Sequence, residues 1–412
     1  MPVGVGTGLW GAVRYSVSSP VFARPLISSL EGGAVGGAAG TFTRATTAYY
    51  QSDTAGALVQ ASSGAARFGY LASLNKQALM IEPAASNLCV RSQEFDNAAW
   101  AKTGTPPVVV ANAVNGPDGT LTADSFTGAA ATDYLSLVNA VVSVASNYVF
   151  SAYLRANTGT PAFKVGCFDN ADSTPSIQEI KTLSTSWARY PLTASFLADG
   201  VGASPNLGGF AGGYTAGALC YLWGAQLELG TGGRSTSYIP TAAAVATRDA
   251  DYLSYAMPAG INASAGTCSC WVQLPWVTDS PPRTAVSLSE SVSGGTRWLG
   301  LRANNGAFPS VFYGNGSVNN TVVSSIGLTG PGTFDQLTVI WSSVSGVNLY
   351  VNGTLAGTNA TPSSIDFTGQ SILVGSRGVI TGQHLGGLIR NLKIWNRVIS
   401  SAEIATDFAA GA

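Results

Sequence analysis

The chain carries little charge. Lys, Arg, Asp and Glu make up 10% of its 412 residues, compared with about 25% in ordinary soluble domains. The formal net charge is −1, so bulk electrostatics attract the protein neither to nucleic acid nor to an anionic membrane. Because a near-neutral surface resists self-association poorly, we expect an oligomer or a subunit of a larger particle. The alternative explanation is only a modest margin of solubility.

Groups suited to catalysis are also scarce. The chain has one histidine, His384, and no G-x-S-x-G turn, so a Ser-His-Asp mechanism would depend on that residue alone. We expect His384 to be a loop histidine. None of the seven glutamates belongs to an E-x-D-x-x-E pattern, which would place acidic side chains on one face of a strand, and glycoside hydrolysis needs two carboxylates. We therefore predict no catalytic residues and no enzymatic activity.

Cysteines are few and odd in number. The five cysteines argue against a complete disulfide framework. Cys268 and Cys270 lie two residues apart on a predicted strand and point to the same face, and no second Cys or His pair completes a zinc site. We predict buried free thiols, which fits folding in a reducing cytoplasm.

Long apolar runs are absent. No stretch reaches the ~18 residues that a transmembrane helix needs, so we expect no membrane insertion. The first ten residues contain several glycines and no basic segment, unlike a signal peptide. If the protein acts outside a cell, we expect it to leave by another route, such as release inside an assembled particle.

The last quarter of the chain contains strong β signals. Residues 347–351 alternate into Asn352-Gly353 and the pattern resumes at 354–356, which predicts a hairpin with a two-residue I′ turn. Further strands are predicted at 371–375 and 387–397. Ser400 and Glu403 have the spacing of a capping box, which predicts a short final helix.

The order of these pieces resembles the laminin-G/pentraxin-like branch of the concanavalin A-like lectin fold. The similar motifs are Leu349-Tyr350-Val351-Asn352-Gly353, Ile372-Leu373-Val374-Gly375 and residues 387–404, with a first strand at 266–274. The resemblance covers about 248–412 and implies a lectin-like β-sandwich. That fold carries lectins, enzymes and plain adhesion modules alike, so it does not settle the activity.

Residues 41–247 contain many short alternating runs, such as 41–44, 57–60, 148–154 and 162–168. Short strands without a strong helix pattern indicate a β-sandwich. The motifs here are similar to a module of bacteriophage head-spike and tail-fibre proteins. They are found at 79–83, 86–88, 92–100, 115–119, 221–228, 236–241 and 246–248. The resemblance implies a jelly roll like those of carbohydrate-binding modules, joined near 241–251 to the lectin-like domain.

Residues 1–40 are rich in Gly, Val and Ala, and we expect a thin segment without a core of its own that is nevertheless too apolar for a solvated tail. We interpret them as an anchor that becomes ordered on a partner, with Leu9, Trp10, Val13 and Tyr15 as candidate contacts. A disordered tail is the alternative. The predicted fold is all-β, with two jelly-roll β-sandwiches in tandem (41–247 and 248–412) and an extended N-terminal anchor (1–40).

Sugar binding needs flat rings and hydrogen-bonding groups near loops. The candidates in the lectin-like domain are Trp276, Trp298, Tyr313 and Asn315, although aromatic rings often fill the core instead. Three other tryptophans lie within predicted strands and are expected in the core: Trp271, Trp341 and Trp395.

Both resemblances raise the possibility of a calcium site, because the two jelly-roll families often bind this ion. The oxygen ligands would come from Glu94, Asp96 and Glu228, and calcium needs about six to eight of them. At the hairpin turn, Asn352 stands where many relatives have Asp, which weakens an ion site there. We assign no metal and no cofactor.

The resemblances imply a structural protein of a phage virion: a head fibre, spike, decoration or tail-fibre subunit. It would be made in the host cytoplasm, lie on the exterior of the virion and adhere to host-surface glycans. Other virion proteins would bind its N-terminus, and a homotrimer is the preferred assembly. The alternatives are a polysaccharide-degrading enzyme and a non-viral bacterial lectin-like adhesin.

Overall fold

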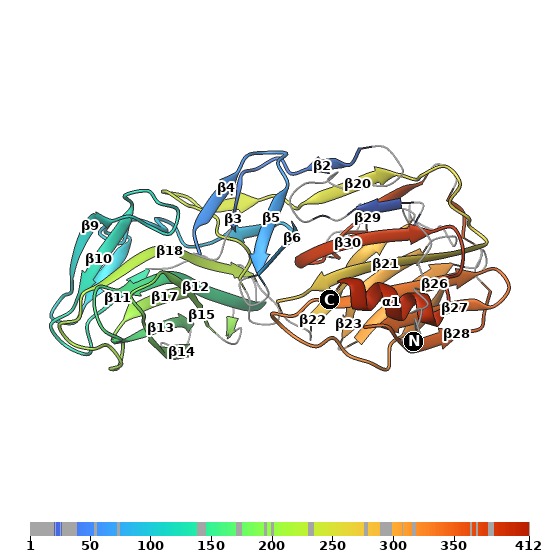
Figure 1. The fold of residues 1–412 in the computed structure, drawn as a ribbon. Coiled ribbons are helices and arrows are strands. Elements are labelled where there is room, and N and C mark those ends of the chain that lie inside the picture. Colours follow the sequence, from blue (N-terminus) through green and yellow to red (C-terminus); the bar gives the residue numbers. More distant parts are fainter. Residues whose placement is uncertain are drawn as a thin grey trace, which may run out of the picture.

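Strands make up nearly all of the regular structure. The computed structural model describes residues 20, 22–24, 26, 39–52, 56–71, 75–137, 146–169, 175–192, 196–198, 202–229, 235–275, 279–288, 299–306, 308–314, 319–362, 365–367, 370–377 and 383–411. These residues contain one helix, α1 (Ser401–Gly411), so the predicted all-β class is confirmed. The strands build two β-sandwich bodies that lie end to end (Figure 1).

The first body consists of two antiparallel sheets in the described part of the chain. One contains, in spatial order, β15 (Ala188–Pro191), β12 (Ser146–Ala156), β18 (Cys220–Leu229), β10 (Ala123–Thr127) and β9 (Val108–Val114), with β16 (Phe196–Ala198) also beside β12. The other contains β14 (Pro175–Thr182), β13 (Ala162–Asp169), β17 (Ala203–Gly208), β11 (Tyr134–Leu137) and β8 (Trp100–Thr103). Alternate side chains of both sheets, such as Phe150, Leu222 and Val165, meet in one core, as period-2 patterning requires.

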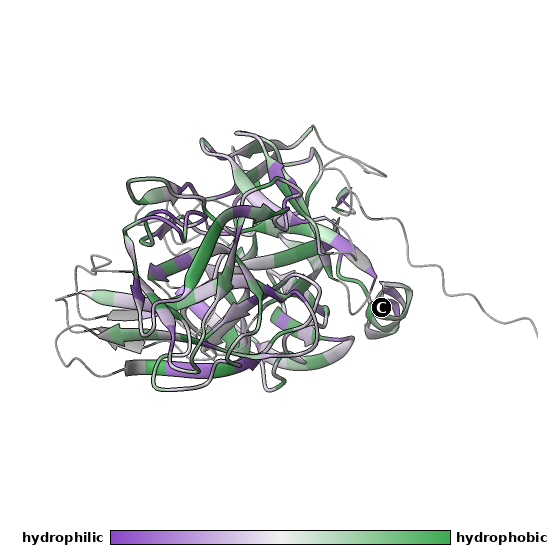
Figure 2. Ribbon diagram, turned by 90° about the vertical axis from the view of Figure 1, so that its left-hand side faces the viewer, coloured by the Kyte–Doolittle hydropathy of each residue, from purple (hydrophilic) through white to green (hydrophobic). Residues whose placement is uncertain are grey.

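The second body is also a sandwich of two antiparallel sheets, within the same described ranges. The first sheet runs β28 (Thr354–Asn359), β27 (Gly346–Val351), β26 (Asp335–Ser342), β21 (Ala265–Gln273), β30 (Gly387–Trp395), β6 (Lys76–Ile81) and β5 (Arg67–Leu71), with β1 (Phe22–Arg24) also beside β30. The second sheet runs β2 (Thr41–Thr43), β20 (Tyr252–Ala256), β29 (Ser371–Val374), β22 (Asp279–Ser287), β23 (Leu299–Gly306), β24 (Phe308–Gly314) and β25 (Asn319–Val323). Figure 2 shows apolar and polar residues interspersed along the strands.

The predicted boundaries at residues 41 and 247 need a correction. Strands β2, β5 and β6 precede the first body in sequence but belong to the sheets of the second body. The chain enters and leaves the first body through a two-stranded ribbon of β7 (Ala85–Asn87) and β19 (Ala246–Arg248), in which Asn87 faces Ala246. The first body is therefore an insertion within the second rather than a domain that precedes it.

The anchor predicted at 1–40 is also corrected in part. Strand β1 pairs with β30, and the side chains of Phe22 and Leu26 are fully buried in the core of the second body. These residues pack on their own chain and not on a partner. Leu9, Trp10, Val13 and Tyr15 lie outside the described residues.

Several local predictions are confirmed. Asn352 and Gly353 have φ values of 49° and 77°, as the turn between β27 and β28 requires. Ser400 and Glu403 form the capping box: the Ser400 backbone N–H donates to Glu403 Oε2 at 2.9 Å, and the Glu403 backbone N–H donates to Ser400 Oγ at 3.3 Å. All five cysteines are buried and free. The three tryptophans expected in the core, Trp271, Trp341 and Trp395, are buried.

Candidate functional site

The structure describes one of the four predicted sugar-binding residues. Tyr313 lies in the core of the second body with no exposed surface, and its hydroxyl donates to the Thr361 carbonyl at 2.9 Å. Because the ring offers no face to a ligand, this prediction is wrong for Tyr313. Trp276, Trp298 and Asn315 lie outside the described residues.

A cleft of about 330 Å³ lies where the two bodies meet. This volume is at the lower end of the range typical of small-ligand sites, about 300–1,000 Å³. The lining residues are Tyr153, Arg189, Ser235, Thr236, Ser237 and Tyr238 of the first body, Tyr49, Tyr50, Gln51 and Leu58 of a hairpin, and Tyr70, Leu71, Met80, Glu82, Gln273, Pro275, Gly386, Gly387 and Leu388 of the second body. Five tyrosines thus surround one cleft.

The hairpin of β3 (Ala48–Gln51) and β4 (Leu58–Ala61) brings two of these tyrosines to the cleft. Tyr49 packs against the first body, with its ring centroid 5.6 Å from that of Tyr238 and 6.2 Å from that of Trp223. Tyr50 is half-buried, as is Tyr70 on β5. Burial raises the pKa of Tyr49, so its phenol stays protonated at neutral pH.

Arg189 on β15 supplies a cation to the cleft. Its Nε donates to Ser151 Oγ at 3.1 Å, and its Nη1 donates to the Thr236 carbonyl. The guanidinium carbon lies 5.5 Å from the centroid of the Tyr153 ring, within the range of a cation–π contact. These contacts fix the orientation of the guanidinium group at the cleft wall.

Glu82 sits at the base of the cleft in a buried ionic network. Its Oε2 accepts from Arg67 Nη1 at 2.8 Å, and the Ser237 backbone N–H donates to its Oε1 at 2.9 Å. Burial alone would raise the pKa of this carboxyl, but the charges of Arg248 and Arg67 and the Ser237 hydrogen bonds lower it to about 2. Glu82 is therefore ionised at neutral pH and is unsuited to act as a general acid.

The same network joins the two bodies. Arg67 also pairs with Asp251, which in turn pairs with Arg44 at 3.0 Å. Since Ser237 belongs to the first body and the charged groups are buried in or beside the second, its two hydrogen bonds to Glu82 cross the joint. The cleft walls are thus held in a fixed relation to one another.

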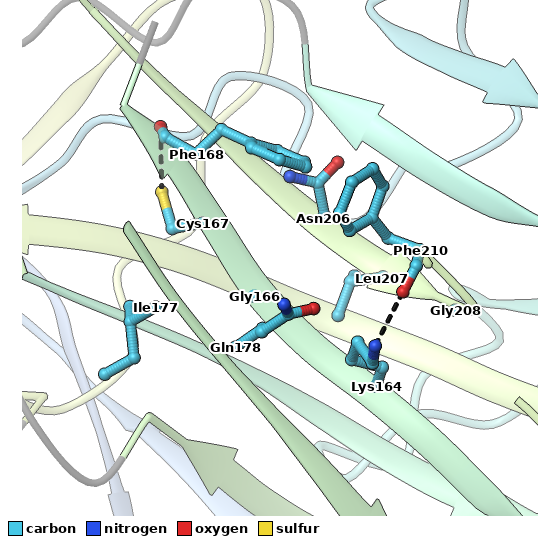
Figure 3. A pocket seen from close by; sticks show the side chains of 10 residues that line it. All are labelled: Lys164, Gly166, Cys167, Phe168, Ile177, Gln178, Asn206, Leu207, Gly208 and Phe210. Carbon is cyan, nitrogen blue, oxygen red and sulfur yellow. Dashed lines mark hydrogen bonds between the residues drawn. The ribbon is translucent and has the colours of Figure 1, made fainter. Parts of the chain in front are cut away.

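A second hollow lies on the outer face of the sheet that contains β13 and β17 (Figure 3). Phe168 and Phe210 meet edge to face with centroids 4.3 Å apart, and Lys164 Nζ donates to the Phe210 carbonyl at 2.7 Å. The free volume is about 10 Å³, which is room for about one water molecule. This slot is too small for a sugar ring and is not the candidate site.

His384 lies in the loop before β30, as expected. It is 2% exposed, its ring packs 4.9 Å from that of Tyr252, and burial lowers its pKa to about 4. Among the residues considered for calcium, Glu94 pairs with Arg91 at 2.8 Å and Glu228 accepts from Gln226 and Thr236. The described ranges contain no group of three or more His, Cys, Asp or Glu residues placed to hold a metal ion. They also contain no helix long and apolar enough to span a bilayer.

The sequence did not identify the cleft residues. Tyr50, Tyr70 and Arg189 belong to segments that are far apart in the chain, and only the insertion of one body into the other brings them together. A Tyr-Tyr pair within a short strand, Tyr49-Tyr50 of β3, was the one local signal available.

Comparison with known families concerns the second body. Residues 247–405 match the family Laminin_G_3, described as the concanavalin A-like lectin/glucanases superfamily, so this part of the chain has a concanavalin A-like lectin fold. No curated protein is significantly similar to the chain.

Among solved structures, the receptor-binding domain of botulinum neurotoxin C/D mosaic serotype is 15% identical with a TM-score of 0.32, and covers 39% of this chain and 41% of that one. The binding domain of botulinum neurotoxin serotype D is 14% identical with a TM-score of 0.31, with 39% and 41% covered. The similarity thus spans about two fifths of those chains.

Proposed function

We propose that this protein is a non-enzymatic structural subunit on the exterior of a phage virion, where it adheres to host-surface glycans. The lectin-like fold of residues 247–405 supports glycan adhesion. The resemblance of the motifs in residues 41–250 to phage head-spike and tail-fibre modules supports the virion role. Leu9, Trp10, Val13 and Tyr15 remain the proposed contacts with other virion proteins.

The cleft carries the proposal for glycan binding. It combines half-buried tyrosine rings, which can stack on the apolar faces of sugars, with guanidinium, amide and hydroxyl groups that can bind sugar hydroxyls. Glu82 is the one carboxylate among its described lining residues, and two arginines engage it. Hydrolysis of a glycosidic bond needs two carboxylates across the bond, so this lining favours binding over turnover.

Copy number would strengthen weak individual sites. A homotrimer, or several copies on one particle, would present several clefts to a surface that carries repeated glycans. Avidity then exceeds the affinity of a single site without any new contact. A non-viral bacterial adhesin would use the same chemistry and differs only in where the protein is displayed.

Binding of the full-length protein to a glycan array tests this proposal. We expect Tyr50→Ala and Tyr70→Ala each to weaken binding about five- to thirty-fold, which corresponds to about 1–2 kcal/mol of lost stacking. Tyr134→Ala is the matched control, because Tyr134 is half-buried but packs on Phe210 outside the cleft. Equal losses of glycan binding in the Tyr50→Ala, Tyr70→Ala and Tyr134→Ala variants, complete loss in all three included, would contradict the cleft as the glycan site. Release of reducing ends from a bound polysaccharide would support the enzyme instead.

A further inference from the structure

The charges that line the cleft are not equally compensated. Arg189 and Glu82 are its charged residues in the part of the chain that the structure describes. Glu82 is paired with Arg67 at 2.8 Å and with Arg248 at 3.6 Å. The negative charge therefore already has two counter-ions inside the protein.

Arg189 forms no ion pair with any of the described carboxylates. Burial raises the pKa of Glu228 and the charge of Arg189 opposes that rise, but the two groups form no ion pair. Asp118, near Tyr49 and Tyr238, forms none with Arg189 either. Glu228 accepts from the side chains of Gln226 and Thr236, and Asp118 accepts from the backbone N–H and hydroxyl of Thr120. Arg189 thus lacks an ion-pair partner of its own among the described residues, and its guanidinium group contacts two hydrogen-bond acceptors and the Tyr153 ring.

The hydrogen-bonding capacity of Arg189 is also incomplete. Nε and Nη1 have acceptors, but Nη2 is shielded from solvent without a partner. Ser235 Oγ, one residue from the Thr236 carbonyl that Arg189 binds, is likewise buried and unpaired. Buried donors without acceptors are costly and rare in folded proteins, so the cleft wall around Arg189 retains unused hydrogen-bonding capacity.

We infer that the cleft takes a glycan residue that carries a carboxylate, with Arg189 as its counter-ion. A guanidinium group matches a carboxylate through two parallel hydrogen bonds, and the contacts to Ser151 and Thr236 preset its orientation. The tyrosine rings would hold the body of the sugar. This inference rests on the proposed function of the same cleft and adds the charge of the ligand.

Paired polysaccharides give a direct test. Oligosaccharides of alginate, hyaluronan and polysialic acid are each compared with their carboxyl-reduced forms by isothermal titration with the full-length protein. We expect at least one acidic form to bind at least tenfold more tightly than its carboxyl-reduced form. This difference in affinity should become smaller as the salt concentration rises. Arg189→Gln should abolish this difference in affinity. Arg189→Lys should keep part of it, since lysine retains the positive charge but lacks the planar guanidinium group with its two parallel N–H donors.

Arg155→Gln is the matched control. Arg155 also stacks on aromatic rings, 4.8 Å from Tyr221 and 5.3 Å from Trp187, but it does not line the cleft, so the preference for the acidic form should persist.

Three outcomes would overturn the inference: equal binding of acidic and reduced forms, an acid preference that survives Arg189→Gln, or binding to neutral glycans alone. Each leaves the proposed function intact if Tyr50→Ala still weakens binding. Binding to no glycan at all would overturn both.

Discussion

At the scale of single residues, Glu82 should dominate the acid sensitivity of the fold. Its pKa falls from 4.5 to about 2 in the folded protein. The ionised carboxylate therefore stabilises the fold fully above pH 4.5, and this contribution is lost as the pH falls toward 2. We expect Glu82→Gln to lower the free energy of unfolding at pH 7 by about 3–5 kcal/mol, because it removes the carboxylate that pairs with buried Arg248 and leaves buried Arg67 with Asp251 alone. Urea unfolding at pH 7 and pH 3 measures both the loss and the flattened pH dependence.

Glu94 provides the control for this prediction. It also pairs with an arginine, Arg91, at 2.8 Å, but its side chain is 42% exposed. Solvent screens such pairs, so Glu94→Gln should cost less than about 1 kcal/mol. Similar losses in the two variants would mean that burial of the Glu82 network contributes little to stability.

Residue type alone did not separate site from core. Tyr313 and Tyr50 are both tyrosines near the ends of strands, yet the Tyr313 ring is buried in the second body and the Tyr50 ring borders the cleft. The difference arises because each side chain points either to the core or away from it, depending on the face of the sheet on which it lies. The alternating pattern of one strand does not show which other strands pack beside that face.

At the scale of elements, the hairpin of β27 and β28 shows why Asn rather than Asp occupies its turn. Asn352 Nδ2 donates to Asp335 Oδ1 at 2.7 Å, and Asn352 Oδ1 accepts from the Gln336 backbone N–H at 2.8 Å. An aspartate keeps the acceptor but places a second carboxylate against Asp335, which is 2% exposed. We expect Asn352→Asp to destabilise the protein by about 1–3 kcal/mol at pH 7, measured by denaturant unfolding, with partial recovery at a pH low enough to protonate one carboxyl.

Asn262→Asp is the matched control. The Asn262 side chain is exposed, and its Oδ1 accepts from the Ser264 backbone N–H at 2.9 Å, a role that a carboxylate can fill. Its effect should stay within about 0.5 kcal/mol, and a loss as large as that of Asn352→Asp would contradict the repulsion argument. Local features such as this turn and the Ser400–Glu403 cap were predictable because their determinants lie within a few residues.

At the scale of the whole molecule, the arrangement of the bodies was the part that the sequence did not reveal. The motifs of both bodies were recognisable, and the runs at 148–154, 162–168 and 387–397 coincide with β12, β13 and β30. The pairing of β6 with β30 and of β2 with β20 joins segments separated by the entire first body. Alternating patterns show that a strand has one buried face, but they carry no information about the sheet it joins.

This arrangement decides which fragments of the chain can fold. A fragment of residues 248–412, the domain that the sequence outlined, lacks β1, β2, β5 and β6 and so loses the buried side chains of Phe22, Leu79 and Ile81 from its core. We expect it to aggregate or to unfold without cooperativity, as measured by size-exclusion chromatography and thermal circular dichroism. A chain in which an Asn-Gly turn replaces residues 88–245 should instead fold cooperatively. Asn87 and Ala246 are already cross-strand partners, so a two-residue I′ turn can join them.

The shortened chain should also be less stable than the intact protein, because removal of Ser237 takes away two hydrogen bonds to Glu82. Cooperative unfolding of residues 248–412 alone would contradict the inserted arrangement, since it would show that the N-terminal strands are dispensable for the second core. Failure of the shortened chain together with stability of the intact protein would instead locate the missing stabilisation at the joint, where the buried charges depend on the first body.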